Sequence, residues 1–282
     1  MSTPFKIVGR QTLVAPLGLR FRDAATGAAV SQGLRVMLYP TANPSRRTQA
    51  FANGSGVYVA QRAAGLRESE MGAGDAEFWK APPSSAPFTI EVVDEERRYL
   101  PYSFPVTLPA KGISTSLLFS APTRSAGGGL ATLRASLWDT VADAPAAWAM
   151  LEARVAGQPV VRGFADELGR VALIFPYPGP ATFAEQSPPP PSAPFTKQEW
   201  PVQLFASYLP QRPVPTLPSL PDALAQPRAK LWADSALTTP LTQATLRSGQ
   251  ELVVRSFDTS PEAPLGGTPL PVLLITPAGS PP

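Results

Sequence analysis

The sequence predicts an all-β protein built from two tandem antiparallel β-sandwich domains with Pro-rich loops. The chain has 282 residues, among them 36 Pro and 21 Gly, which are poorly tolerated inside helices. Short runs of alternating apolar residues recur along the chain, and turn-forming residues close each run. Hydrophobic residues make up 44% of the chain, so each domain can bury a core.

Five strands are predicted in the first 120 residues. In the first of them, Leu17, Leu19 and Phe21 alternate with polar or small residues and share one face, and a turn follows at residues 23–27. The other four strands are predicted at residues 34–39, 57–59, 88–93 and 99–108. Prolines interrupt the last of these, which makes it an edge strand because proline cannot donate to a sheet ladder.

A Gly-rich stretch at residues 121–129 predicts a flexible linker, because its three adjacent glycines carry no side chains that can pack. We therefore predict an N-terminal sandwich at residues 1–122, a linker at residues 123–129 and a C-terminal sandwich at residues 130–282.

The C-terminal half repeats features of the N-terminal half. A predicted strand that ends in Asp139 matches the one that ends in Asp23. The turn at residues 166–169 precedes a strand, as does the turn at residues 53–56. Two interpretations stay open: a duplication of one β domain, or a turn that unrelated antiparallel domains have in common.

The C-terminal half also carries a Pro-rich insert at residues 178–195, in which four prolines follow one another at residues 188–191. We expect an exposed polyproline loop there, in preference to a ligand for an SH3 domain. Strands are predicted at residues 133–139, 149–155, 170–175, 200–209, 229–232, 243–246, 251–256 and 270–276. Residues 228–282 either complete the second sandwich or form a small third domain. Completion is favoured, because about 55 residues are few for an independent core.

The composition excludes most enzyme mechanisms. The chain has no His and no Cys, so it has no imidazole base, no thiolate nucleophile, no disulfide and none of the usual zinc ligands. Carboxylates cluster at residues 75–77, 94–96 and 166–167, where we expect solvated turns or loops. Neither a calcium-binding loop nor a phosphate-binding loop motif occurs. We therefore predict no catalytic residue, no cofactor and no metal site.

The charge balance and the apolar pattern bear on partners. Lys and Arg exceed Asp and Glu by 24 to 21, and this small, scattered surplus argues against nucleic acid binding. No apolar stretch approaches the roughly 20 residues of a membrane span. The first residues lack the pattern of a secretory signal, so we expect synthesis in the cytoplasm. No small-molecule substrate is inferred, and other protein subunits are the expected partners.

An aromatic pair, Phe78 and Trp79, lies in an irregular stretch rich in small residues, at positions 68–87. Such a pair either packs back over its own sheet or anchors a partner protein, and it is our candidate partner-binding site. The other four tryptophans are Trp138, Trp148, Trp200 and Trp232. They are expected to fill cores, and an aromatic sugar-binding platform is a further option.

Residues 13–110 resemble the transthyretin-like, carboxypeptidase-regulatory type of Ig-like β-sandwich. The motifs behind this resemblance are an Asp-x-x-Thr-Gly turn at residues 23–27, a strand ending in Tyr39-Pro40 and an Asn-x-x-Gly turn at residues 53–56. A narrower resemblance, to proteins that accompany phage-tail-like extracellular contractile injection systems, rests on the segments at residues 33–40, 54–58 and 88–101.

That resemblance implies a non-enzymatic structural subunit that binds neighbouring subunits in the sheath, baseplate or cap of a contractile particle, which is assembled after cytoplasmic synthesis and can be released. The second half of the chain carries no motif of that group. The alternative is a carbohydrate- or cell-surface-binding module of an adhesin or fibre.

Overall fold

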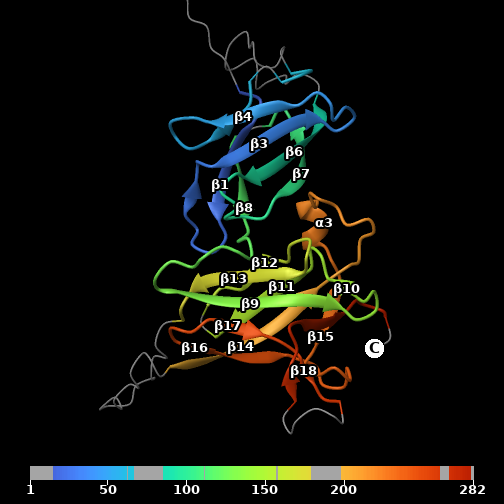
Figure 1. Cartoon of the computed structure of the whole chain (residues 1–282). Coiled ribbons are helices and arrows are strands. Elements are labelled where there is room, and N and C mark those ends of the chain that lie inside the picture. Colours follow the sequence, from blue (N-terminus) through green and yellow to red (C-terminus); the bar gives the residue numbers. More distant parts are fainter. Residues whose placement is uncertain are drawn as a thin grey trace, which may run out of the picture. The chain divides into compact units, whose positions relative to one another are not determined.

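The computed structural model describes residues 15–61, 63–66, 85–110, 112–156, 158–178, 198–260 and 267–280. Within these residues the protein is all-β, as predicted, and its one helix, α3 (Leu220–Leu224), is five residues long (Figure 1). No helix in this part of the chain is long and apolar enough to cross a membrane.

The described residues divide into two compact units. The second unit contains the chain from residue 117 onward together with two segments of the N-terminal half, residues 22–28 and 94–102. The first unit contains the rest. The boundary at residues 123–129 stays a prediction.

The strands before residue 120 form one curled, eight-stranded sheet in the order β2-β1-β5-β4-β3-β6-β7, with β8 paired to β1. The strands are β1 (Gly18–Asp23), β2 (Ala29–Val30), β3 (Leu34–Pro40), β4 (Thr48–Ala52), β5 (Tyr58–Val59), β6 (Ala86–Asp94), β7 (Tyr102–Leu108) and β8 (Ser114–Leu118). Leu17, Leu19 and Phe21 are buried together, as their alternation predicts. The Pro-interrupted strand β7 lies at an edge.

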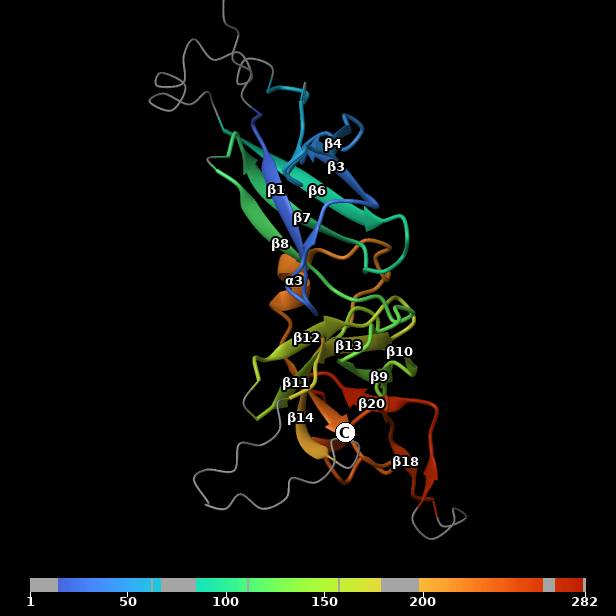
Figure 2. The same ribbon diagram turned by 90° about the vertical axis from the view of Figure 1, so that its left-hand side faces the viewer.

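The strands after residue 129 form a ten-stranded sheet in the order β10-β9-β20-β15-β14-β11-β12, to which β13 and β17 add at β9 and β16 adds at β14 (Figures 1 and 2). They are β9 (Leu130–Asp139), β10 (Ala144–Pro145), β11 (Met150–Val155), β12 (Val161–Phe164), β13 (Arg170–Pro176), β14 (Glu199–Ser207), β15 (Arg228–Trp232), β16 (Gln243–Arg247), β17 (Leu252–Val254) and β20 (Leu273–Thr276). A separate hairpin joins β18 (Phe257–Asp258) and β19 (Thr268–Pro269).

The late strands of the chain pair inside the ten-stranded sheet. Strands β17 and β20 both run parallel to β9, so this sheet is mixed rather than purely antiparallel. Parallel neighbours need a long connection, which the distance of more than 100 residues along the chain supplies. One core fills the sandwich, because β9, β11, β13 and β14 all turn alternate apolar side chains inward, among them Leu133, Leu151, Leu173 and Leu204.

The two sheets have the same pairing pattern. Strand β1 pairs with β5, the strand after the Asn53 turn, and β9 pairs with β13, the strand after the Asp166 turn. The next hairpins, β3–β4 and β11–β12, also correspond. Duplication predicts this shared order, whereas a turn common to unrelated β domains does not require it.

The corresponding turns are closed in the same way. The side-chain Oδ1 of Asn53 accepts hydrogen bonds from the backbone N–H groups of Ser55 and Val57, and that of Asp166 accepts them from Leu168 and Arg170. Each turn contains a glycine in the left-handed region, with φ of 72° at residue 56 and 75° at residue 169.

Gly169→Ala tests how much the Asp166 turn depends on its glycine. A Cβ there would lie 2.4 Å from the carbonyl oxygen of Leu137, so backbone strain and a clash add up. We expect a loss of unfolding free energy on the order of 3 kcal/mol or more by urea denaturation. Gly27→Ala is the matched control, because its φ is 72° but nothing lies within 4 Å of the new Cβ. The control should lose about 1–2 kcal/mol; equal losses would contradict the close approach.

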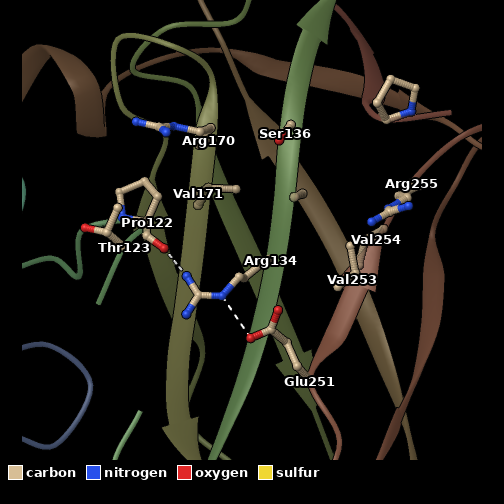
Figure 3. Close-up of a pocket in the computed structure, with 12 residues that line it drawn as sticks. Pro122, Thr123, Arg134, Ser136, Arg170, Val171, Glu251, Val253, Val254 and Arg255 are labelled. Atoms are coloured by element: carbon tan, nitrogen blue, oxygen red, sulfur yellow. Dashed lines mark hydrogen bonds and ion pairs between the residues drawn. The ribbon is translucent and has the colours of Figure 1, made fainter. Parts of the chain in front are cut away.

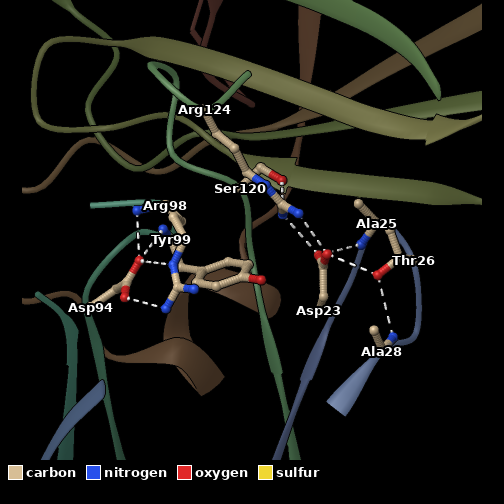
Figure 4. Close-up of polar contacts among 9 residues, drawn as sticks. All are labelled: Asp23, Ala25, Thr26, Ala28, Asp94, Arg98, Tyr99, Ser120 and Arg124. Atoms are coloured by element: carbon tan, nitrogen blue, oxygen red, sulfur yellow. Dashed lines mark hydrogen bonds and ion pairs between the residues drawn. The ribbon is translucent and has the colours of Figure 1, made fainter. Parts of the chain in front are cut away.

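A network of two Asp–Arg pairs surrounds Tyr99 in the second unit (Figure 4). Arg124 donates to both carboxylate oxygens of Asp23, at 2.9 and 2.6 Å, and Arg98 donates to both oxygens of Asp94, at 3.1 and 2.9 Å. The guanidinium carbons of Arg124 and Arg98 lie 4.8 and 5.4 Å from the centre of the Tyr99 ring. Arg124 belongs to the predicted flexible linker, yet this pair ties it to the end of β1.

The pKa of Asp23 lies below its usual value. Burial by itself would raise this pKa, but hydrogen bonds from Arg124, from the Ala25 backbone and from Thr26, together with the charge of Arg124, outweigh burial. The carboxylate therefore stabilises the fold above the pKa of the unfolded chain, and this stabilisation is lost as the pH falls through the lower pKa of the folded state.

Asp23→Asn should make the protein less stable at neutral pH by about 2–3 kcal/mol, because it removes a buried bidentate charge pair. The difference from the wild type should shrink as the pH falls below about 4, where the wild-type carboxylate also becomes protonated. Urea denaturation of both proteins from pH 2 to pH 7 measures this. A difference that stays constant over that range would show that the Asp23 charge does not stabilise the fold.

Candidate binding surface

The candidate anchors Phe78 and Trp79 lie outside the described residues, so their role stays a prediction. Three of the other tryptophans, Trp148, Trp200 and Trp232, are buried with 4–9% of their surface exposed, as expected of core residues. Trp138 is half-buried, and its Nε1 donates to Asp143.

The predicted carboxylate cluster at residues 75–77 lies outside the described residues, whereas those at residues 94–96 and 166–167 are described. Glu95, Glu96 and Glu167 are exposed, as expected for solvated turns. Asp94 and Asp166 are buried, which corrects our expectation for these two residues. Their oxygens accept backbone N–H groups of the turns that follow, so they need no solvent. No group of three acidic residues in the described part of the chain is placed to hold a metal ion.

A cationic cluster lies on the outer face of the second sandwich. The registers of β11 with β12 and with β14 place Glu152 opposite Arg162 on one side and opposite Phe205 on the other. Because side chains alternate along a strand, Glu152 and Arg154 point away from the core that Leu151 and Ala153 fill.

Three arginines share the single carboxylate of Glu152. The nearest N···O distances are 2.7 Å from Arg154, 3.0 Å from Arg162 and 3.3 Å from Arg228. The side chain of Glu152 is 1% exposed, whereas those of the arginines are 46–52% exposed. Burial would raise the pKa of Glu152, but the hydrogen bonds from Arg162 and Arg154 and the charge of Arg228 lower it. The carboxylate is thus charged at neutral pH and balances only one of three positive charges.

Aromatic rings extend this cluster across the sheet. The guanidinium carbons of Arg154 and Arg228 lie 4.6 and 5.3 Å from the centre of the Phe205 ring. The ammonium of Lys230 lies 5.7 Å from the ring centre of Trp232. The cluster of Arg154, Arg162, Arg228 and Lys230 around Glu152 has a net charge of +3, which equals the surplus of the whole chain.

A groove of about 560 Å³ opens beside the cationic cluster. It lies where β14 changes its pairing partner, from β16 at residues 199–203 to β15 at residues 206 and 207. Leu204, Leu231 and Leu241 give it an apolar lining, and Phe205, Arg228 and Lys230 line it as well. This volume is typical of sites that bind a small molecule or a short peptide segment. An apolar groove beside unbalanced positive charge suits an occupant that is both apolar and anionic.

A second, smaller pocket of about 290 Å³ lies over β9, β13 and β17 (Figure 3). Arg134 donates to the carbonyl oxygens of Pro122 and Arg124 and pairs with Glu251 at 2.9 Å. Arg170 pairs with Asp166 at 2.7 Å. Most of the positive charge in this pocket is therefore balanced by the protein itself, which makes it the weaker candidate.

The sequence alone hardly predicts the cationic groove. Glu152, Arg162 and Arg228 belong to three strands, and 76 positions separate the first from the last. One feature of the sequence could have pointed to it: Glu152, Arg154, Arg228 and Lys230 occupy alternate positions in strand-like runs, where an outward face is expected to be mixed in charge.

No protein-family model and no curated protein sequence matches the chain. Solved structures give distant likenesses only. The shaft pilin SpaA from Lactobacillus rhamnosus GG is 10% identical with a TM-score of 0.23, and the match covers 94% of this chain and 98% of that one. A putative adhesin from Bacteroides ovatus is 10% identical with a TM-score of 0.22, covering 92% and 91%. A streptococcal ancillary pilin is 10% identical with a TM-score of 0.22, covering 87% and 63%. Likenesses at this level support no inference about function.

Glu152→Gln should lower the unfolding free energy by about 1–2 kcal/mol, because three arginines then face one another without a counter-charge. Solvent screens part of this repulsion since the arginines are half exposed, and added salt should therefore reduce the loss further. Glu199→Gln is the matched control, because it removes an exposed pair with Arg247 and should change stability by less than about 0.5 kcal/mol. Urea denaturation at low and high salt measures both; an equal effect of the two variants would contradict the structural role of Glu152.

Proposed function

We propose that the chain is a non-enzymatic structural subunit of a larger assembly and that it binds a neighbouring protein through the cationic groove. The observation that carries this proposal is the pairing of an apolar groove with a cluster of half-exposed arginines that share one buried carboxylate. Protein interfaces combine apolar anchors with arginines in this way.

The resemblance of the first half to proteins of contractile injection systems supports a phage-tail-like particle as the assembly. Its neighbours there are sheath, baseplate or cap subunits, and assembly follows synthesis in the cytoplasm. A surface fibre or adhesin is the alternative assembly, and it needs the same kind of contact between subunits.

The buried tryptophans and Phe205 give little support to the carbohydrate-binding part of that alternative. Sugar rings stack on open aromatic faces, but Trp148, Trp200 and Trp232 are buried. The guanidinium groups of Arg154 and Arg228 lie over the ring of Phe205, so a sugar ring could not stack there without displacing them. The positive charge of the groove favours an acidic protein surface as the partner.

A comparison of Lys230→Glu with Arg255→Glu tests the proposal. Both residues are exposed, and neither has an ion pair among the contacts of the described residues; Lys230 lines the groove and Arg255 lines the smaller pocket. Tagged versions are expressed in the cells that carry the gene, and native assemblies are separated by sedimentation. We expect wild type and Arg255→Glu to sediment with an assembly and Lys230→Glu to be depleted from it at least fivefold.

Electron microscopy of the sedimented fraction then distinguishes a contractile particle from a surface fibre. Wild-type protein that remains monomeric in these cells would overturn the subunit proposal. Equal incorporation of the two variants would overturn the assignment to the groove. Thermal melting of each purified variant shows that a loss of incorporation does not come from unfolding.

A further inference from the structure

The groove needs an occupant that is anionic and apolar together, and the protein itself contains one segment of that chemistry. Residues 68–79 hold four carboxylates, Glu68, Glu70, Asp75 and Glu77, with no basic residue among them. One other stretch of this length, residues 85–96, also holds four carboxylates and no basic residue, but most of it forms β6 (Ala86–Asp94) and is therefore already part of the first sheet. The segment at residues 68–79 ends in the aromatic pair at residues 78 and 79.

The two partners are complementary in charge. The segment has a net charge of −4 and the cationic cluster a net charge of +3. Arg228 belongs both to the cluster around Glu152 and to the lining of the groove, so one occupant can contact both. Half-exposed arginines on a sheet face keep their donors available to a carboxylate from another molecule.

The spacing of the groups also agrees. Along an extended segment, Asp75, Glu77 and Trp79 would share one side, about 6.6–6.8 Å apart. On the groove, Arg228 and Lys230 are likewise two positions apart on β15. Both edges of β15 are already paired, by β20 on one side and by β14 and residues 240–241 on the other, so the segment would lie across the outer face of β15. There its carboxylates would meet Arg228 and Lys230, and its aromatic end would reach the apolar lining. Phe and Trp are residues that commonly anchor such contacts.

We propose that residues 68–79 of one copy bind in the cationic groove of a second copy, so that the protein assembles with itself. The acidic residues contact Arg154, Arg228 and Lys230, and Phe78 and Trp79 fill the groove. This inference rests on the proposed function, because it names the neighbour that the groove binds. The same contact gives a role both to the aromatic pair at residues 78 and 79 and to the arginines that Glu152 does not balance.

The first test measures binding of a peptide. A fluorescent, end-capped peptide of residues 68–79 is titrated with full-length protein in which these twelve positions are Gly and Ser, so that no internal copy competes. Anisotropy should show saturable binding that weakens as salt is raised. Lys230→Glu in the receptor should weaken it at least tenfold, whereas Arg255→Glu should leave it within twofold.

Two variant peptides separate the contributions of charge and aromatic side chains. One carries Phe78→Ala and Trp79→Ala, and the other carries Gln or Asn in place of the four carboxylates. Each should bind at least tenfold more weakly than the parent peptide. Failure of the parent peptide to bind a folded receptor would overturn the proposal.

The second test decides whether the contact joins two copies, and it uses two complementary variants of the full-length protein. The groove variant carries Lys230→Glu and keeps residues 68–79, whereas the segment variant keeps the groove and has Gly and Ser at residues 68–79. Each variant alone should be monomeric by analytical ultracentrifugation, and an equimolar mixture should form a dimer. Full-length Phe78→Ala, Trp79→Ala protein replaces the segment variant if the Gly/Ser protein does not fold.

A peptide that binds while the mixture and the wild type stay monomeric up to high concentration would mean that the segment docks within its own molecule, and would overturn the second-copy assignment. If the peptide does not bind but assembly in cells still depends on Lys230, then this inference fails and the proposed function stands. If assembly does not depend on Lys230 either, then both fail.

Discussion

Buried aspartates close several turns of this protein and so help to fix the register of the strands that the turns connect. Five aspartates with 0–8% of their surface exposed each accept hydrogen bonds from backbone N–H groups a few residues further along the chain: Asp23, Asp94, Asp139, Asp166 and Asp234. For Asp234 the backbone and side-chain hydrogen bonds from Thr238 and Thr239 lower the pKa to about 2. A protein without disulfides needs such local closure, because a slip of one residue would turn each strand's apolar face outward.

These aspartates also form ion pairs with some of the arginines and leave others without a carboxylate of their own. Arg98, Arg124 and Arg170 neutralise turn aspartates, so their charge serves the fold. Around Glu152 the ratio is reversed, since three arginines meet one carboxylate. The surplus positive charge therefore concentrates on one sheet face beside an apolar groove. Such a concentration costs repulsion within the folded chain, which an anionic partner of the kind proposed would relieve.

Local patterns account for most of the strands. The runs around Leu19, Val36, Ile90, Leu133 and Leu204 alternate cleanly, and each forms a strand with its apolar side buried. Strands β4 and β8 escaped prediction because each buries a single side chain, Ala50 or Leu118, and so shows no alternation. Helix α3 was also missed inside a Pro-rich stretch, although Ser219 at its N-cap, a proline in its first turn and Asp222 are ordinary helix-start features.

The sequence by itself determined the all-β class, the turns and the absence of His and Cys chemistry, because these follow from residue type and short-range periodicity. It also marked Phe78 and Trp79 as an unusual pair, whose role stays a prediction. Only the tertiary structure decided that Glu152 is buried beneath Arg154, Arg162 and Arg228, and that a groove lies where β14 changes partner from β16 to β15. The reason is physical: pairing between strands up to 76 positions apart brings these charges together, and no local pattern encodes which distant strands become neighbours.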